Sequence, residues 1–139
     1  MPNEILFKCI DITADYVADG ESLIVNRLFK LELDGKCFFD DFLETSPKKI
    51  QNKTKTIAEL DAILTLIIEG SPTTRNKVRP LSGSNEWEIR IKRTRLYFFI
   101  DPPSKNIVVL GHYNKKNDDQ QEFIDKFQSI KESFLKRKK

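Results

Sequence analysis

"WEIRIKRTRLYFFI", residues 87–100, places four cationic residues among large apolar ones in two short runs. Both runs suit strands of a half-buried sheet, and a turn at Arg93-Thr94 would join them as a hairpin with Lys92 facing Arg95. A tight turn usually needs Asn or Gly at positive φ, so the loop type stays open; a four-residue loop sorts the side chains in the same way. Facing residues of an antiparallel pair share a side of the sheet, so one face carries Trp87, Ile89, Ile91, Leu96, Phe98 and Ile100. The opposite face carries Glu88, Arg90, Lys92, Arg95, Tyr97 and Phe99, and is a basic platform.

A third strand is predicted from "NIVVLGHY", residues 106–113, after the Pro-rich turn "DPPSK". If Ile100 faces Ile107, then Phe98 faces Val109 and Leu96 faces Gly111. Arg95 then lies beside the only histidine, His112. A five-residue loop would reverse the parity and separate the two.

The rest of the chain predicts two further strands and two main helices. Residues 4–12 and 23–33 have strand character and are joined by a turn around Asp19-Gly20. A short amphipathic stretch at 37–47 precedes a long helix that begins after Ser46 and ends at Gly70. The segment 71–86 is predicted as a loop. Asp118 or Asp119 begins a final helix, with an apolar stripe of Phe123, Phe127, Ile130, Phe134 and Leu135.

This order predicts an α+β fold of two layers, in which an antiparallel-rich sheet has helices packed on one face. The basic face would remain open. We expect one domain over 1–139, with 1–22 as an extra N-terminal strand segment.

Composition excludes several classes of protein. No apolar run reaches the roughly 18 residues needed to span a membrane, and "MPNEILF" lacks the basic start of a secretion signal, so we expect a cytoplasmic protein with no membrane partner. Cys9 and Cys37 have no CxxC spacing, which indicates reduced packing residues and no metal site.

Charge is distributed unevenly along the chain. Residues 1–70 hold 8 Lys and Arg against 13 Asp and Glu, whereas residues 71–139 hold 16 against 8. A basic second half indicates a polyanionic partner such as nucleic acid, although a solvated charged surface is an alternative. Lys77 and Arg79, with Arg75, would then form either a binding lip beside the sheet or merely a solvated loop.

Four segments together resemble the RelE/ParE toxin superfamily, nearest to its HigB-like and phage-derived branch. They are "LELDGKCFFDDFLETSP" (31–47), the helix ending in "IIEG" (67–70), "PLSGSNEWEIRIKRTRLYFFI" (80–100) and "IVVLGHYNKKNDD" (107–119). The resemblance implies a RelE-like fold and the toxin component of a type II toxin-antitoxin system. Such toxins cleave mRNA on the ribosome without metal or cofactor, by attack of the RNA 2′-hydroxyl, and are held inactive by an antitoxin, here expected to be a helix-turn-helix protein.

The resemblance also implies site residues. Arg95 matches the strand arginine that contacts the scissile phosphate, Arg90 a basic position on the preceding strand, and Lys115 and Lys116 the basic residues after the last strand. His112 is the candidate general acid or base because imidazole titrates near neutral pH. Lys92, Tyr97, Lys115 and Arg79 are predicted to bind RNA, with Tyr97 stacking on an unpaired base.

Two departures from the family keep other functions open. Glu88 stands where ribosome-cleaving relatives carry a lysine, and the match at His112 is displaced by one position. The alternatives are a ParE-like inhibitor of DNA gyrase and a degenerate member that only binds RNA or protein.

Overall fold

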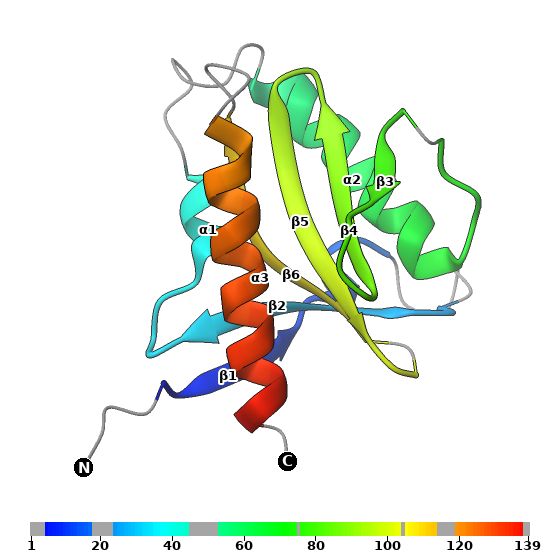
Figure 1. The fold of residues 1–139 in the computed structure, drawn as a ribbon. Helices are drawn as coiled ribbons and strands as arrows, with labels where there is room; N and C mark the ends of the chain where they lie inside the picture. Colours follow the sequence, from blue (N-terminus) through cyan, green and yellow to red (C-terminus); the bar gives the residue numbers. More distant parts are fainter. Residues whose placement is uncertain are drawn as a thin grey trace.

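The computed structural model describes residues 5–17, 24–44, 53–74, 76–103, 105–113 and 119–137. Over these residues the chain forms one six-stranded mixed sheet and three α-helices, which confirms the predicted α+β class (Figure 1). The elements in chain order are β1 (Phe7–Asp11), η1 (Thr13–Asp15), β2 (Arg27–Leu33), α1 (Phe38–Leu43), α2 (Lys53–Glu69), β3 (Val78–Pro80), β4 (Glu86–Ile91), β5 (Thr94–Asp101), β6 (Lys105–Tyr113) and α3 (Asp119–Arg137). The predicted turn at Asp19-Gly20 and the predicted helix start after Ser46 lie outside the described residues.

The sheet has the order β1-β2-β6-β5-β4-β3. β1 and β2 pair antiparallel, as predicted. β2 and β6 pair in parallel, so a strand from the first quarter of the chain lies beside one from the last third. β3 was predicted as loop. It is a three-residue edge strand paired with β4, and it makes the predicted three-stranded meander four-stranded.

The β4–β5 hairpin has the predicted faces but a different turn. Arg90 faces Arg95, and Lys92-Arg93 forms the turn, with Lys92 at φ 54°. The predicted pairing of Lys92 with Arg95 is therefore wrong. Because the observed register has the same parity as the predicted one, the paired residues of both strands still point to their predicted sides, while Lys92 leaves its predicted face for the turn.

The β5–β6 pairing is correct at one end and wrong at the other. Arg95 faces His112 and Leu96 faces Gly111, as predicted. A β-bulge between Tyr97 and Phe98 then shifts the register, so Ile100 faces Asn106, not Ile107, and Phe98 faces Val108, not Val109. Val109 of β6 is the extra residue, because Tyr97 faces Leu110 and Phe98 faces Val108; it changes the parity of the ladder within the hairpin.

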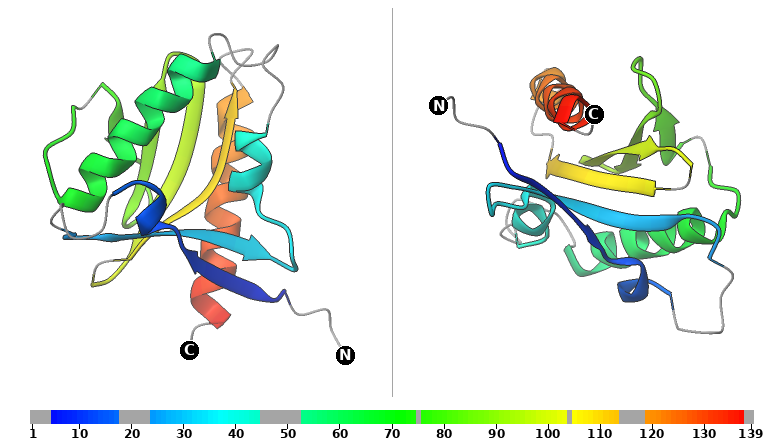
Figure 2. Two further views of the ribbon diagram at one scale, coloured as in Figure 1. Left: turned by 180° about the vertical axis from the view of Figure 1, so that it is seen from behind. Right: turned by 90° about the horizontal axis from the view of Figure 1, so that it is seen from below.

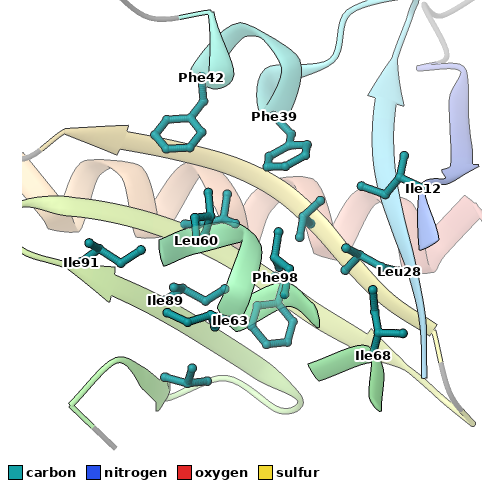
Figure 3. Close-up of a cluster of buried hydrophobic side chains, with 14 of the residues drawn as sticks. Ile12, Leu28, Phe39, Phe42, Leu60, Ile63, Ile68, Ile89, Ile91 and Phe98 are labelled. Carbon is teal, nitrogen blue, oxygen red and sulfur yellow. The ribbon is translucent and has the colours of Figure 1, made fainter. Parts of the chain in front are cut away.

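Helices cover both faces of the sheet, which corrects the prediction of helices on one face (Figure 2). α1 and α2 lie on one side, where Phe39, Phe42, Leu60, Ile63 and Ile89 belong to one cluster of buried apolar side chains (Figure 3). α3 lies on the other side. Its stripe, apart from exposed Leu135, packs on the aromatic and aliphatic side chains of β5 and β6. The prediction failed because the middle of β5, residues 96–100, is apolar at every position and therefore requires a cover on each face.

Candidate functional site

Register brings six of the predicted or discussed polar residues together on the α3 face of the sheet. Across β3, β4 and β5, Arg79, Glu88 and Tyr97 occupy one row. Across β4, β5 and β6, Arg90, Arg95 and His112 occupy the next. Because directly opposed residues point to the same side, the two rows form one group. We call Glu88, Arg90, Arg95, Tyr97 and His112 the covered cluster.

Arg95 supports the hairpin turn in this structure. Its Nη1 donates to the carbonyl oxygens of Lys92 at 2.6 Å and Thr94 at 2.9 Å, while the side chain is almost fully buried. Burial, and then the like charge of Arg90 opposite, lowers the pKa of Arg95. Its Nε has no hydrogen-bond partner among the described residues. The guanidinium thus retains one buried donor for a further acceptor.

Glu88 lies at the centre of the cationic residues. Arg90 Nε is 3.5 Å from Glu88 Oε1, and Gln120 of α3 donates to Glu88 Oε2. Burial raises the pKa of Glu88, although the charges of Arg90, Arg95 and Arg79 act in the opposite direction. A buried carboxyl with a raised pKa next to arginines is a group suited to accept or hold a proton.

Tyr97 and His112 form the second proton-carrying unit. The Tyr97 hydroxyl and His112 Nε2 are 2.8 Å apart, a hydrogen bond whose direction depends on the imidazole tautomer. Burial raises the pKa of Tyr97, so its hydroxyl keeps its proton near neutral pH. The His112 ring stacks on Phe123 of α3 with centroids 3.9 Å apart, and Tyr97 lies between His112 and Phe127.

The first turns of α3 cover this cluster. The exposed fractions are 0% for Tyr97, 4% for Glu88, 6% for Arg95 and 7% for His112. The prediction of an open basic face is therefore wrong, and Tyr97 does not offer a surface for base stacking. The physical reason is that Phe123 and Phe127 bury their rings against the same face.

Two other predicted residues are exposed, and one of them, Arg79, lies directly opposite Glu88 at the edge of the covered cluster. Lys92 is exposed in the hairpin turn, and Arg79 is exposed on β3. Lys115 and Lys116 lie outside the described residues, as does Arg75. Cys37 is buried and Cys9 is partly buried, and each packs in an apolar cluster.

Sequence reasoning missed the polar contacts that attach α3 to β4. Glu86 accepts from Gln128 Nε2 at 2.7 Å and pairs with Lys131 Nζ at 3.0 Å, and Lys131 also donates to the Ser84 carbonyl. Together with Gln120 on Glu88, these contacts attach both halves of the helix to one strand. The available signal was a pair of carboxylates at alternate positions of a largely buried strand, which need buried partners.

A cleft of about 800 Å³ opens at the β3 edge, next to the covered cluster. We call it the edge cleft; it is lined by Asn76, Val78, Arg79, Pro80, Trp87 and Arg90. Arg90 belongs to both sites, and its side chain is 32% exposed. The edge cleft is therefore the accessible part of the basic region.

Within the described ranges, no three His, Cys, Asp or Glu side chains gather as a metal site, and no helix combines the length and apolarity of a membrane span. No protein-family model, curated protein or solved structure matches the chain.

Proposed function

We propose that this chain is the toxin component of a type II toxin-antitoxin system, with a RelE-like fold, that cleaves mRNA on the ribosome in the cytoplasm. The observation that carries the proposal is the meeting of three arginines, a carboxyl of raised pKa and a Tyr–His pair in two adjacent rows of one sheet face. Phosphodiester cleavage needs cations for the charge on phosphorus and two groups that move protons.

The proposed reaction is a transesterification within RNA. The 2′-oxygen forms a bond to phosphorus as the phosphorus–5′-oxygen bond breaks, giving a 2′,3′-cyclic phosphate and a 5′-hydroxyl. Glu88 or His112 accepts the proton from the 2′-hydroxyl, and the Tyr97–His112 pair returns one to the 5′-oxygen. Arg95 and Arg90 stabilise the anionic phosphorane, with guanidinium N–H groups matched to phosphate oxygens.

Access to this cluster requires movement of the first turns of α3. Gln120 and Phe123 make the contacts that cover Glu88 and His112, whereas Phe127 and Ile130 anchor the following turns in the apolar layer. Displacing only the first turns breaks the Gln120–Glu88 hydrogen bond and the Phe123–His112 stack. In the proposed function, the ribosome-bound mRNA replaces these contacts.

Induced expression tests the proposal most directly. Wild-type chain, Arg95→Lys, His112→Gln and the control Lys8→Gln, on the opposite sheet edge, are induced in matched cultures while growth is followed and mRNA 5′ ends are mapped. We expect growth arrest and new 5′-hydroxyl ends in translated codons for the wild type and the control, with both lost in the two site variants. Thermal unfolding of the purified variants separates loss of chemistry from loss of fold, because Arg95 also bonds to the hairpin turn.

Burial of the cluster favours a second candidate, a non-catalytic member that binds RNA or protein at its surface. In that case expression leaves mRNA intact, and Phe123→Ala, which uncovers His112, produces no cleavage either. Growth arrest without new ends, accompanied by inhibition of DNA supercoiling, would indicate the gyrase-inhibitor alternative.

The proposal includes a cognate antitoxin of the helix-turn-helix type. Co-expression with the product of an adjacent small reading frame should restore growth and yield a complex that co-purifies. Neutralisation by such a protein would support the toxin assignment independently of the cleavage chemistry.

A further inference from the structure

The two edges of the described sheet differ in how readily they accept another strand. At the β3 edge, the Val78 N–H already donates to the Thr74 carbonyl at 2.9 Å, Pro80 has no N–H, and the strand is three residues long. Edge strands with these features resist pairing with a second chain. At the other edge, β1 has five residues and contains no proline. A strand added to this sheet would therefore pair with β1.

The backbone of β1 presents hydrogen-bonding groups on its outer side. The Ile12 N–H donates to the Leu28 carbonyl at 2.9 Å, and such bonds recur at every second residue of an antiparallel ladder. Phe7 and Asp11 are an odd number of residues from Ile12, so their N–H and C=O groups point away from β2. In the described part of the chain, no strand lies on that side.

An apolar hollow lies beside the same edge, at the end of α3. The last turns of α3 extend past β1 (Figures 1 and 2). A hollow of about 270 Å³ opens there; we call it the end hollow, and it is lined by Ile5, Leu6, Phe7, Phe134 and Arg137. Leu6 is 72% exposed, and Arg137 is the only charged residue among the described ones that line the hollow. The end hollow therefore suits a partner that brings a carboxylate together with a strand.

A second copy of this chain supplies both. When β1 pairs antiparallel with β1 of a second copy over its full length, Cys9 lies on the two-fold axis and Phe7 faces the second copy's Asp11. Phe7 and Cys9 pack in the cluster on the α3 side, so alternation places Asp11 on that side too. The second copy's Asp11 thus lies next to the end hollow and Arg137.

Charge favours this register over its neighbours. A shift of two residues in one direction puts Lys8 opposite Lys8 of the second copy, and like charges directly opposed are destabilising. A shift in the other direction puts Asp11 opposite Cys9, away from Arg137. In the full-length register Lys8 faces Ile10, and no like charges are directly opposed.

Asp11 is also accessible to the second copy. Its carboxylate accepts from the Thr13 N–H at 2.9 Å and from Arg27 Nε at 2.7 Å, which leaves further lone pairs for Arg137. η1, which follows β1, lies on the α2 side of the sheet (Figure 2). The α3 side of Asp11 is therefore clear for the end of the other copy's α3.

We propose that this chain forms a two-fold symmetric dimer by antiparallel pairing of β1 with β1, in which Asp11 of each copy contacts Arg137 of the other. The two six-stranded sheets then become one continuous sheet. The β3 edge and the covered cluster stay outside this interface, so the inference does not depend on the proposed function.

Mass and cross-linking test the dimer directly. Sedimentation equilibrium over a dilution series up to about 1 mM chain should show twice the 16.2 kDa of one copy at the upper end. Directly opposed Cβ atoms are about 5 Å apart, so a short bis-maleimide should join two copies through Cys9. Cys9→Ser should abolish this cross-link and Cys37→Ser, at a buried thiol, should leave it unchanged.

Charge reversal tests the register. Arg137→Glu and Asp11→Lys should each weaken the dimer at least about tenfold, and the double variant should recover most of the loss. Arg137→Glu leaves the Asp11–Arg27 ion pair intact, and thermal unfolding separates loss of association from loss of fold. The control Lys8→Gln, on the same strand but the other face, should change the dissociation constant by less than about twofold.

Each contrary outcome overturns the inference. A mass of 16.2 kDa at every concentration would show that the β1 edge does not pair with a second copy. A dimer that cross-links through Cys37, or that neither charge reversal weakens, would place the interface elsewhere. mRNA cleavage bears only on the proposed function: a nuclease that stays monomeric removes the dimer alone, and a β1-paired dimer without cleavage removes the nuclease alone.

Discussion

The buried pair between Glu86 and Lys131 should contribute strongly to the attachment of α3. Lys131 Nζ is 3.0 Å from Glu86 Oε2, and the two side chains are 6% and 12% exposed for Glu86 and Lys131 respectively. At an effective dielectric constant of about 20, two unit charges at this distance attract by about 5.5 kcal/mol. Desolvation opposes much of that attraction, so we expect a net coupling of about 2 kcal/mol.

A double-mutant cycle measures this coupling. Lys131→Met leaves the Glu86 carboxylate buried with only Gln128 as a donor from α3, and should cost about 3 kcal/mol in the free energy of unfolding. Glu86→Gln removes the charge and keeps the shape. The double variant should cost about 2 kcal/mol less than the sum of the two single variants. Urea denaturation followed by Trp87 fluorescence gives all four free energies.

The same helix provides a matched control. Lys136 and Glu132 form an ion pair at 3.6 Å, but both side chains are more than two-thirds exposed. The equivalent cycle at this pair should show a coupling below about 0.5 kcal/mol. If the Glu86–Lys131 cycle is also additive within about 0.3 kcal/mol, the reasoning is refuted and apolar contacts alone hold the helix.

Three other changes have defined outcomes. Burial raises the pKa of Glu88, so the folded chain binds a proton at this carboxyl more tightly than the unfolded chain does. The free energy of unfolding should therefore fall as pH rises from about 4.5 through the folded pKa. Glu88→Gln should remove this trend in urea unfolding between about pH 4 and 8. In Gly111→Ala the new Cβ would lie 2.9 Å from Phe42 Cγ and 3.0 Å from the Arg95 carbonyl oxygen, which should cost about 1–3 kcal/mol in thermal unfolding, partly restored by Phe42→Leu. Phe127→Ala truncates a fully buried ring between Tyr97 and the rest of α3, and should cost about 3–5 kcal/mol and abolish hydrogen-exchange protection in the helix.

The contrary results are equally specific. A pH trend that survives in Glu88→Gln would assign the titration to another group. Equal destabilisation of Gly111→Ala with and without Phe42→Leu would place the clash at the Arg95 carbonyl. Retained protection of α3 in Phe127→Ala would show that its polar contacts to β4 suffice.

The sides of the β4–β5 hairpin were predictable because alternation depends only on parity. Trp87, Ile89 and Leu96 share a face whether the turn begins at Lys92 or Arg93. The turn itself was not predictable, because Lys92 adopts positive φ without being Gly or Asn, and the Arg95 side chain bonds to its carbonyl. Such support comes from tertiary contacts and leaves no local signal.

Long-range features were the least accessible from sequence. The parallel pairing of β2 with β6 joins residues more than 70 positions apart, and the run "IVVL" gives no sign of which residue is extra at the bulge. The cover over the site was signalled only indirectly. A helix stripe such as Phe123, Phe127 and Ile130 shows that a helix packs, but not on which face of the sheet. The unbroken apolar run of β5 indicated burial on both faces.

The β-bulge between β5 and β6 divides that hairpin into two separately registered halves. One half contains the pair between Asp101 and Lys105, which the hairpin loop connects, and the half beyond the bulge contains the pair between Arg95 and His112. A change of one residue in loop length could be compensated by gain or loss of the extra residue, with no movement of His112. The bulge therefore allows the length of the loop to change by one residue while Arg95 and His112 remain paired.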